Sequence, residues 1–280
     1  MISILIPTYN RSELLEKRAL KSVFAQIYKD YEVIVIDDCS TDNTAEIIKK
    51  YPITYFRNNK NLGKAGSLNK GIDLAKGEYI VFLDDDNELF PEFLERTINK
   101  INGYDAVQTG RIINYGPIHK YASPYTGNFY ASIDWGWLIK KEVFDKIQYD
   151  ENMFGDEDAD LGIQFAKHFK KINIDEPLQM AYSTEEDDKD SMCIPTERRL
   201  KALDYFIKKN IKEYKDKNEL RYLYRLAGRN WYKGGYKLKG LNYFWKSFLA
   251  MPNLKTFKHL FFILFGWESY NSFMNSYERN

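Results

Sequence analysis

The sequence predicts an α/β fold in which helices flank a mostly parallel sheet, followed by a helical extension at the C-terminus. Over the first hundred residues, short apolar runs alternate with segments of helical spacing, as in parallel sheets with right-handed crossovers. The 280 residues are 44% hydrophobic and 29% charged, a composition that supports an ordinary globular core. Beyond Thr196 the chain has a helical pattern and is rich in Lys, Arg, Tyr, Phe and Trp.

Each element is predicted from its residue pattern. Residues 33–36 are a continuous β-branched run, which is typical of a parallel strand covered on both faces. Ser40 or Thr41 is suited to cap a helix that ends at Lys50, and Pro91 occupies the favoured first position of another helix. We expect strands over residues 2–6, 33–36, 53–56 and 79–83, and further helices over residues 11–26 and 64–76.

Charge is unevenly distributed along the chain, although the formal net charge is only +1. Residues 195–280 carry 18 Lys and Arg against 7 Asp and Glu, a balance of +11, which leaves 23 basic and 33 acidic residues, a balance of −10, before them. This asymmetry indicates an acidic part suited to a metal and a basic part suited to phosphates or an anionic surface. The acidic run over residues 185–190 is typical of a solvated linker, so we place a boundary after residue 190.

The two cysteines, Cys39 and Cys193, do not provide a disulfide framework. The apolar N-terminus lacks the basic start of a signal peptide. The longest apolar run, residues 260–265, is far shorter than the ~20 residues that a membrane span needs. We therefore expect a cytoplasmic protein, with peripheral attachment to the membrane as an alternative.

Three adjacent carboxylates, Asp84, Asp85 and Asp86, follow the strand predicted over residues 79–83. Such carboxylates repel one another unless a cation or hydrogen-bond donors compensate, and oxygen ligands of this kind suit Mg²⁺ or Mn²⁺. An acidic turn at the start of the next helix explains the same residues equally well.

A second acidic cluster begins with Asp37 and Asp38, directly after the strand predicted over residues 33–36. A carboxylate in this place can accept a hydrogen bond from a nucleotide base or a ribose hydroxyl, although a helix N-cap is the simpler explanation of the cluster taken alone. In parallel α/β sheets, ligands bind at the carboxyl ends of the strands, where both clusters fall. Together the clusters predict one acidic crevice.

Several motifs follow one another along the chain. They are residues 6–10 (Ile-Pro-Thr-Tyr-Asn), 37–42 (Asp-Asp-Cys-Ser-Thr-Asp), 61–64 (Asn-Leu-Gly-Lys), 75–80 (Ala-Lys-Gly-Glu-Tyr-Ile), 84–86, 138–144, 149–151 and 155–161 (Gly-Asp-Glu-Asp-Ala-Asp-Leu). This ordered set resembles the inverting family-2 glycosyltransferases of the Rossmann-like GT-A fold, in their non-processive form. The resemblance covers about residues 1–182. With the boundary given above, we expect a GT-A catalytic domain over residues 1–190 and a helical, basic and aromatic region over residues 191–280.

The resemblance implies roles for the matching residues. Those expected to bind the nucleotide-sugar donor are Pro7, Thr8, Tyr9, Asp37, Asp38, Asn69, Asp84 and Asp85. Asp86 would coordinate Mn²⁺ or Mg²⁺, and Asp158 would be the general base. Trp135, Gly136 and Glu157 would shape the acceptor site, although two Trp residues within three positions are equally consistent with packing.

The implied reaction moves a sugar from a nucleotide diphosphate, most commonly UDP in the family, to an acceptor hydroxyl with inversion. Asp158 would remove the acceptor proton, while the metal neutralises charge on the leaving nucleotide diphosphate. The expected acceptor is a saccharide or lipid-linked saccharide in glycan or cell-surface polysaccharide biosynthesis.

Some residues depart from the family pattern. Many non-processive members have Ala-Arg-Asn where this chain has Ser67-Leu68-Asn69, so an arginine contact to the nucleotide is expected to be missing. Lys64 can supply that charge instead, although a solvated residue at a helix start is the simpler interpretation. The Gln-x-x-Arg-Trp motif of processive synthases is not found, which favours single-sugar transfer.

Residues 252–267 place Leu and Phe at helical spacing with lysines among them. This pattern fits a helix at an anionic lipid surface or, more simply, a helix packed on the catalytic domain or on a second subunit. Membrane-surface association and a homo-oligomer are therefore both open. Nucleic-acid binding is disfavoured because no RNA-binding motif accompanies the basic and aromatic residues.

Two other functions fit parts of the pattern. A nucleotidyltransferase also uses an α/β sheet and an acidic metal site, but it would be expected to have a Gly-rich, basic loop after the first strand, and residues 7–11 are not one. A catalytically inactive module that binds nucleotide-sugars would keep the crevice without turnover.

Overall fold

The computed structural model describes residues 1–124, 133, 136–182, 196–252, 257, 261 and 263. The chain forms two compact units, of which one comprises Met1–Asn152 and Glu157–Ser191 and the other Met153–Asp156 and Met192–Asn280. The boundary expected after residue 190 falls within residues 183–195, outside the described residues, and stays a prediction.

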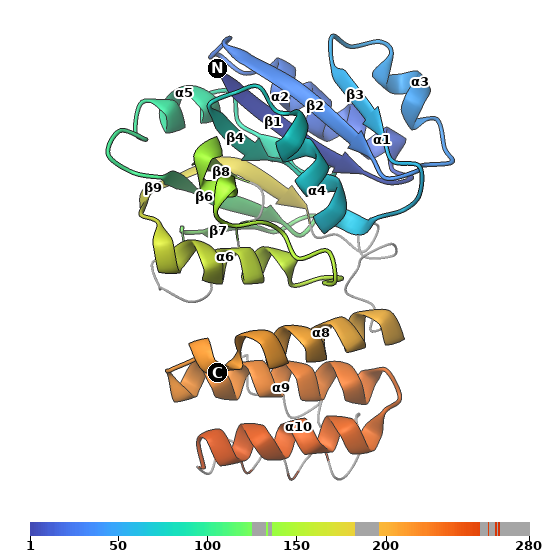
Figure 1. Cartoon of the computed structure of the whole chain (residues 1–280), viewed down its shortest axis with the longest axis vertical. Coiled ribbons are helices and arrows are strands. Elements are labelled where there is room, and N and C mark those ends of the chain that lie inside the picture. The colour runs from blue at the N-terminus through green and yellow to red at the C-terminus, as the bar shows by residue number, and fades with distance from the viewer. Residues whose placement is uncertain are drawn as a thin grey trace. The chain divides into compact units, whose positions relative to one another are not determined.

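The first unit is built on one mixed sheet (Figure 1). Within the described residues its strands are β1 (Ile2–Thr8), β2 (Tyr31–Asp37), β3 (Thr54–Arg57), β4 (Tyr79–Phe82), β5 (Glu88–Leu89), β6 (Ala106–Asn114), β7 (His119–Ala122), β8 (Trp137–Lys140) and β9 (Lys171–Tyr182). They lie in the order β3-β2-β1-β4-β8-β6-β9-β5, and β7 pairs with β6. The first four are parallel to one another, β8 is antiparallel to both of its neighbours, and β6 and β9 are parallel again. The predicted α/β class is confirmed.

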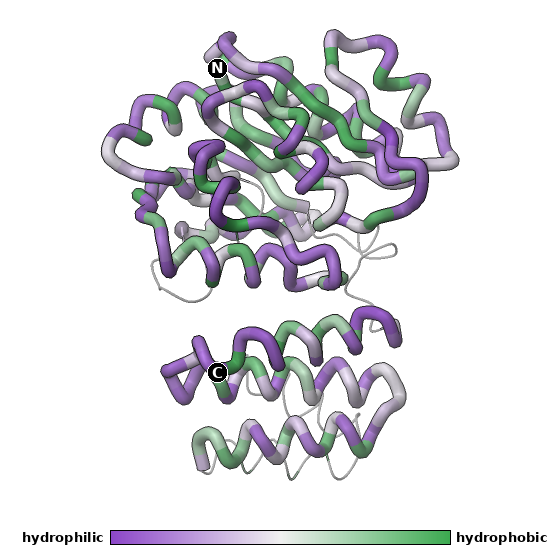
Figure 2. Tube along the Cα trace, viewed as in Figure 1, coloured by the Kyte–Doolittle hydropathy of each residue, from purple (hydrophilic) through white to green (hydrophobic). Residues whose placement is uncertain are grey.

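Helices pack on both faces of this sheet. They are α1 (Ser12–Leu14), α2 (Lys21–Phe24), α3 (Thr44–Ile48), α4 (Gly63–Leu74), α5 (Phe93–Ile98) and α6 (Glu157–His168). In β1, Ile4 belongs to a core cluster with Phe93, whereas its neighbour Leu5 belongs to a second cluster with Leu68 of α4. Because both faces of each central strand are buried, these strands are apolar without alternation, as Figure 2 shows along β1 and β2.

The first helical segment departs from regular geometry. A single helix was expected over residues 11–26, and the observed one runs from Ser12 to Phe24 with a π-helical middle, Leu15–Leu20. Leu15 and Leu20 are fully buried in the sheet-facing core, so the predicted apolar face is present.

The helix after β2 begins later than expected. Neither Ser40 nor Thr41 caps it, because α3 starts at Thr44, whose N–H donates to Asp42 Oδ1 at 3.1 Å. Ser40 Oγ instead accepts the Asn10 N–H at 2.9 Å. This bond ties the loop after β1 to the loop after β2.

The second unit contains three helices of eight or more residues among the described residues: α8 (Glu197–Asn210), α9 (Lys217–Lys233) and α10 (Lys237–Ala250). The predicted helical extension is thereby confirmed. Thr196 caps α8 by accepting the Arg199 N–H at 3.3 Å, and Asp216 caps α9 by accepting the Asn218 N–H at 2.7 Å. Most of the helix expected over residues 252–267 lies outside the described residues. In the described part of the chain, no helix combines the length and apolar character that crossing a membrane requires.

We predict that Gly77→Ala destabilises the first unit by about 1–3 kcal/mol, the usual cost of overpacking. Gly77 lies just before β4, and a Cβ there would be 2.6 Å from the backbone nitrogen of Ser3 in β1. Because that neighbour is backbone, it cannot move aside as a side chain can. Urea denaturation would measure the change, with the exposed neighbour Lys76→Ala as the control. Equal midpoints for the two variants would show that β1 and β4 approach less closely in solution.

Candidate active site

The carboxyl ends of β1, β2 and β4 meet at one edge of the sheet. β1 lies between the other two, and its last residue, Thr8, is opposite Asp37 at the end of β2. Thr8 Oγ1 donates a hydrogen bond of 2.7 Å to Asp85 Oδ2, so the loop after β4 reaches the end of β1. The two acidic clusters seen in the sequence therefore share this edge.

Arg11 balances part of the first acidic cluster. Its Nη1 lies 2.7 Å from Asp86 Oδ2 and 3.4 Å from Asp85 Oδ1. Asp85 is 5% exposed, and burial together with the charge of Asp86 raises the pKa of Asp85 to about 7, despite the attraction of Arg11. Burial and the neighbouring Asp84 likewise raise the pKa of Asp86. The cluster therefore holds more negative charge than Arg11 compensates.

Lys64 connects this cluster to the predicted base. It is the second residue of α4, and its Nζ lies 2.8 Å from Asp84 Oδ1 and 3.5 Å from Asp158 Oδ2. Burial lowers the pKa of Lys64, but the attraction of Asp158 and Asp84 outweighs this and raises the pKa well above its usual value. The Lys64 side chain is only 18% exposed, so its interpretation as a solvated helix-start residue is wrong.

Asp38 caps the helix that carries Lys64. Its Oδ1 accepts the Leu62 N–H at 2.7 Å and Asn58 Nδ2 at 2.9 Å, and its Oδ2 accepts the Gly63 N–H at 2.8 Å. A carboxylate can accept about four hydrogen bonds, so capacity for one more remains. A nucleotide contact by Asp38 stays a prediction.

Two other residues that were predicted to bind the nucleotide-sugar donor make hydrogen bonds within the protein. Asp37 is fully buried and accepts hydrogen bonds of 2.7 Å from the Ser40 N–H and from the Tyr55 hydroxyl. Asn69 donates to the Tyr149 carbonyl at 3.0 Å and accepts the Tyr149 N–H at 3.1 Å. Direct contact of either side chain with a nucleotide also stays a prediction.

The residues predicted to line the base lie at the end of β1. Pro7 is half-buried and Thr8 is buried, whereas Tyr9 is 47% exposed. The Tyr9 ring is therefore accessible for stacking on a flat ring such as a nucleotide base.

The residues predicted for the acceptor are described in part. Trp135 lies outside the described residues. Gly136 has a φ of +86°, and a Cβ there would overlap the side-chain amide of Gln179, so only glycine fits. Glu157 is 3% exposed, and its Oε2 has no hydrogen-bond partner within the described part of the chain. An unpaired buried oxygen is costly, so Glu157 is suited to bind a ligand hydroxyl or a water molecule.

Arg11 was not among the site residues predicted from the sequence. One feature of the sequence could have indicated a role for it, namely that Arg11 is a basic residue in the loop after β1. From that loop its charge reaches the carboxylates after β4. Pairing between loops of different strands has no periodic pattern in the sequence, so the contact could be seen only in the folded chain.

The residues present fit a partial metal site at Asp86. Among the described residues, no three His, Cys, Asp or Glu side chains are grouped as a complete site would need. Mg²⁺, however, is commonly bound through one or two carboxylates, with substrate phosphates and water in the other positions. The excess negative charge around Asp85 and Asp86 suits a cation, and Arg11 would have to release Asp86 to admit one.

Comparison with known sequences identifies relatives of the first unit. Residues 3–159 match the family described as glycosyl transferase family 2. A GalNAc(5)-diNAcBac-PP-undecaprenol beta-1,3-glucosyltransferase of Campylobacter jejuni is 33% identical over 182 residues, which span 56% of this chain and 57% of that protein. This match thus covers little more than half of the length of that relative.

Two solved structures resemble the chain in fold. S. aureus TarS 1–349 in complex with UDP-GlcNAc has a TM-score of 0.66 at 19% identity, with 90% of this chain and 81% of that chain covered. The mannosyltransferase PcManGT from Pyrobaculum calidifontis, in complex with GDP-Man and Mn²⁺, has a TM-score of 0.58 at 20% identity, with 92% and 78% covered. At these identities the likeness concerns the fold, and the expected GT-A fold is confirmed.

We predict that Asp38→Ala lowers the free energy of unfolding by about 1–2 kcal/mol in the absence of any nucleotide, because the N–H groups of Leu62 and Gly63 lose their cap. Chemical denaturation would measure the loss. Asp73→Ala, which removes an exposed carboxylate from the same helix, is the matched control and should change stability by less than about 0.5 kcal/mol. Parental stability of the Asp38 variant would mean that the carboxylate does not hold α4 in solution.

Proposed function

The chain belongs to glycosyl transferase family 2, and on this premise we propose that it transfers a sugar from a nucleotide diphosphate to an acceptor hydroxyl with inversion. The observation that carries the proposal is the ionic link from Lys64 to both Asp84 and Asp158. This link brings a carboxylate from the start of α6 to the edge of the sheet where parallel α/β folds bind their ligands.

The proposed donor is a UDP-sugar, with a GDP-sugar as the alternative. Support comes from the structural neighbours, since TarS was solved with UDP-GlcNAc and PcManGT with GDP-Man. Tyr9 is exposed at the end of β1 for contact with the base, and Asp38 retains capacity for one further hydrogen bond. Asp84 and Asp85 are proposed to approach the ribose and the donor sugar.

Asp158 is the proposed general base. Its carboxylate takes the proton of the acceptor hydroxyl as the acceptor oxygen bonds to the anomeric carbon. The bond from that carbon to the diphosphate oxygen breaks, and its electron pair leaves with the nucleotide diphosphate. A single displacement from the opposite face inverts the anomeric configuration. Lys64, which lies 3.5 Å from Asp158, holds the carboxylate at the crevice.

The proposed cofactor is Mn²⁺ or Mg²⁺, held by Asp86 together with the diphosphate. When bound, the ion neutralises charge on the departing nucleotide diphosphate. Support comes from the excess negative charge at Asp85 and Asp86 and from the Mn²⁺ in the PcManGT complex. Arg11, once released from Asp86, has a guanidinium suited to bind a phosphate.

The proposed acceptor is a saccharide, free or lipid-linked, in the assembly of a glycan or cell-surface polysaccharide. The name of the Campylobacter jejuni relative refers to a saccharide on PP-undecaprenol, which supports this class. Gly136 and Glu157 are the described residues that we assign to the acceptor side. We also propose a cytoplasmic location, and for residues 191–280 a role in attachment to the membrane surface or in self-association.

We predict that UDP raises the melting temperature only when Mn²⁺ or Mg²⁺ is present, and that Asp86→Ala abolishes the effect of the metal. A ligand at a hundred times its dissociation constant stabilises the folded state by about 2.7 kcal/mol, which thermal denaturation detects readily. GDP, dTDP and CMP serve as comparisons. No shift with any nucleotide, in protein shown to be folded, would contradict the proposed donor site.

We predict that Asp158→Asn abolishes sugar transfer while the metal-dependent shift with UDP persists. The amide has nearly the same size but cannot accept the acceptor proton. Asp145→Asn makes the same chemical change at an exposed carboxylate and should retain parental rates. Turnover assays with a panel of nucleotide-sugars would measure both variants. Near-parental transfer by Asp158→Asn would contradict the role of Asp158 as the general base. If the parent protein bound the nucleotide-sugar without turnover, it would be an inactive nucleotide-sugar-binding module.

A further inference from the structure

Tyr149 is a buried residue of the first unit to which the proposed reaction gives no role. It lies between β8 and α6 and is 3% exposed. Its ring meets the ring of Phe82 edge-on, with 5.5 Å between the ring centroids. Phe82 is the last residue of β4, two residues before Asp84. Tyr149 therefore packs against the strand end that leads into the acidic cluster.

The Tyr149 hydroxyl is connected to the backbone of the proposed base. It donates a hydrogen bond of 3.2 Å to the carbonyl of Ile133, and the Ile133 N–H donates one of 3.0 Å to the carbonyl of Asp158. A carbonyl oxygen has two lone pairs, so Asp158 can accept this bond in addition to one within α6. Ile133 is fully buried, so both of its backbone groups depend on these partners.

Asn69 ties Tyr149 to α4. The Asn69 side chain donates to the Tyr149 carbonyl at 3.0 Å and accepts the Tyr149 N–H at 3.1 Å, so both backbone groups of Tyr149 are engaged. Asn69 lies five residues after Lys64 on the same helix, and Lys64 Nζ is 3.5 Å from Asp158 Oδ2. Helix α4 therefore reaches Asp158 by two routes, through Lys64 at the carboxylate and through Asn69 at the backbone.

The Tyr149 hydroxyl stays protonated. Burial, together with the negative charge of Asp158, raises the pKa of Tyr149 well above its usual value. A protonated phenol remains a hydrogen-bond donor to Ile133, and it cannot take a proton from an acceptor hydroxyl as a base does. Tyr149 is therefore suited to support the proposed base and unsuited to replace it.

We propose that Tyr149, fixed by Asn69, is a positioning residue for Asp158, an inference that rests on the proposed function. A lysine ammonium is a compact charge with rotatable donors, so its ion pair with Asp158 leaves the direction of the carboxylate free. The hydrogen bonds through Ile133 fix the backbone from which that carboxylate projects. Displacement of a catalytic group by about 1 Å can cost about a hundredfold in rate, so this second anchor matters to the reaction.

The first test is Tyr149→Phe, which keeps the buried ring and removes only the hydroxyl. The probe is the release of UDP, with Mn²⁺ present and water as acceptor, from whichever of UDP-glucose, UDP-galactose and UDP-GlcNAc the parent turns over fastest. Rates are expressed per UDP-binding site counted by calorimetry, so misfolded protein does not contribute. We expect kcat to fall at least about tenfold while the affinity for UDP stays within about twofold.

The matched control is Tyr31→Phe. The Tyr31 hydroxyl donates to the Val23 carbonyl at 2.8 Å, which is the same kind of bond, and Tyr31 lies at the end of β2 opposite to the site. This variant should keep the parental kcat.

Hydrogen exchange of the Ile133 amide tests the connection without any substrate. In protein labelled with ¹⁵N-isoleucine, Tyr149→Phe should exchange this amide at least about tenfold faster than the parent, because the bond that holds Ile133 from the other side is lost. The amide of Ile139, which lies in β8 opposite Ile80, is the internal reference and should change much less.

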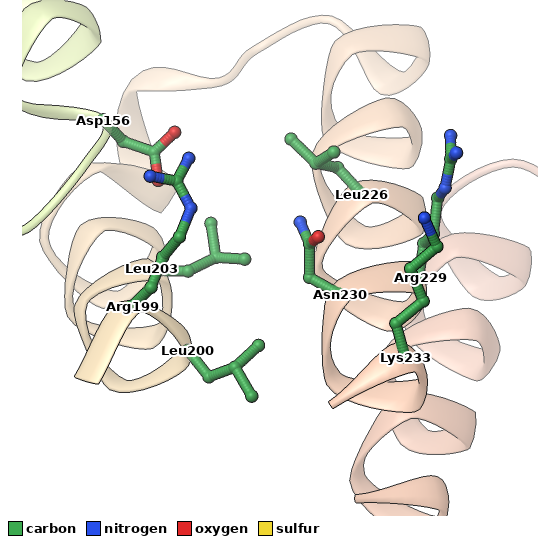
Figure 3. Close-up of a pocket in the computed structure, with 8 residues that line it drawn as sticks. All are labelled: Asp156, Arg199, Leu200, Leu203, Leu226, Arg229, Asn230 and Lys233. Atoms are coloured by element: carbon green, nitrogen blue, oxygen red, sulfur yellow. The ribbon is translucent and has the colours of Figure 1, made fainter. Parts of the chain in front are cut away.

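Asn69→Ala tests the anchor on α4. It should lower kcat as Tyr149→Phe does and leave the affinity for UDP unchanged, whereas a residue that contacts the nucleotide would lose UDP affinity instead. Asn230→Ala is the control, because Asn230 is also a half-buried helical asparagine and lines a pocket of the second unit (Figure 3). It should behave as the parent does.

Parental kcat in Tyr149→Phe would overturn the positioning role. An unchanged Ile133 exchange rate, or acceleration shared equally by Ile139, would overturn it as well, since the second result means a general loss of stability. Weakened UDP binding with parental kcat in Asn69→Ala would assign Asn69 to the donor and remove it from the anchor. If the parent neither binds UDP nor releases it from any donor, the proposed function fails, and with it the catalytic meaning of the anchor, whether or not Ile133 exchange responds to Tyr149→Phe.

Discussion

The candidate site depends on the balance of charge among carboxylates at the edge of the sheet. Asp84, Asp85 and Asp86 follow one another after β4, and burial, together with the charge of Asp86, raises the pKa of Asp85 to about 7. Arg11 and Lys64 supply the compensating charge from two other elements. Without cations, ionised carboxylates at this depth would be strongly unfavourable. The ion pairs of Arg11 and Lys64 therefore hold together the loops that form the crevice.

The position of Lys64 depends in turn on Asp38. Asp38 accepts the N–H groups of Leu62 and Gly63, and Lys64 is the next residue along α4. The cap therefore sets the start of the helix, and the helix sets the lysine between Asp84 and Asp158. Hydrogen bonding by Asp38 at the end of β2 is thus coupled to the placement of the Asp158 carboxylate on α6.

Sequence patterns predicted those features that depend on local periodicity and on strand ends. The apolar runs gave the central strands, and both acidic clusters lie at the same edge because parallel strands end together. The patterns were less reliable for detail. The π-helical turn at Leu15–Leu20 has no signature in the spacing, and the helix after β2 begins at Thr44 because Ser40 is engaged by the loop after β1. The solvated interpretation of Lys64 was wrong because exposure depends on residues distant in the chain.

By itself the sequence determined the fold class, the edge at which the site lies and the residue types gathered there, since these follow from hydrophobic period and chain order. Only the tertiary structure decided which charges pair. Arg11 with Asp86 and Lys64 with Asp158 each join segments that are far apart in the chain. Such pairs form because burial makes an uncompensated charge costly, and burial exists only once the chain has folded.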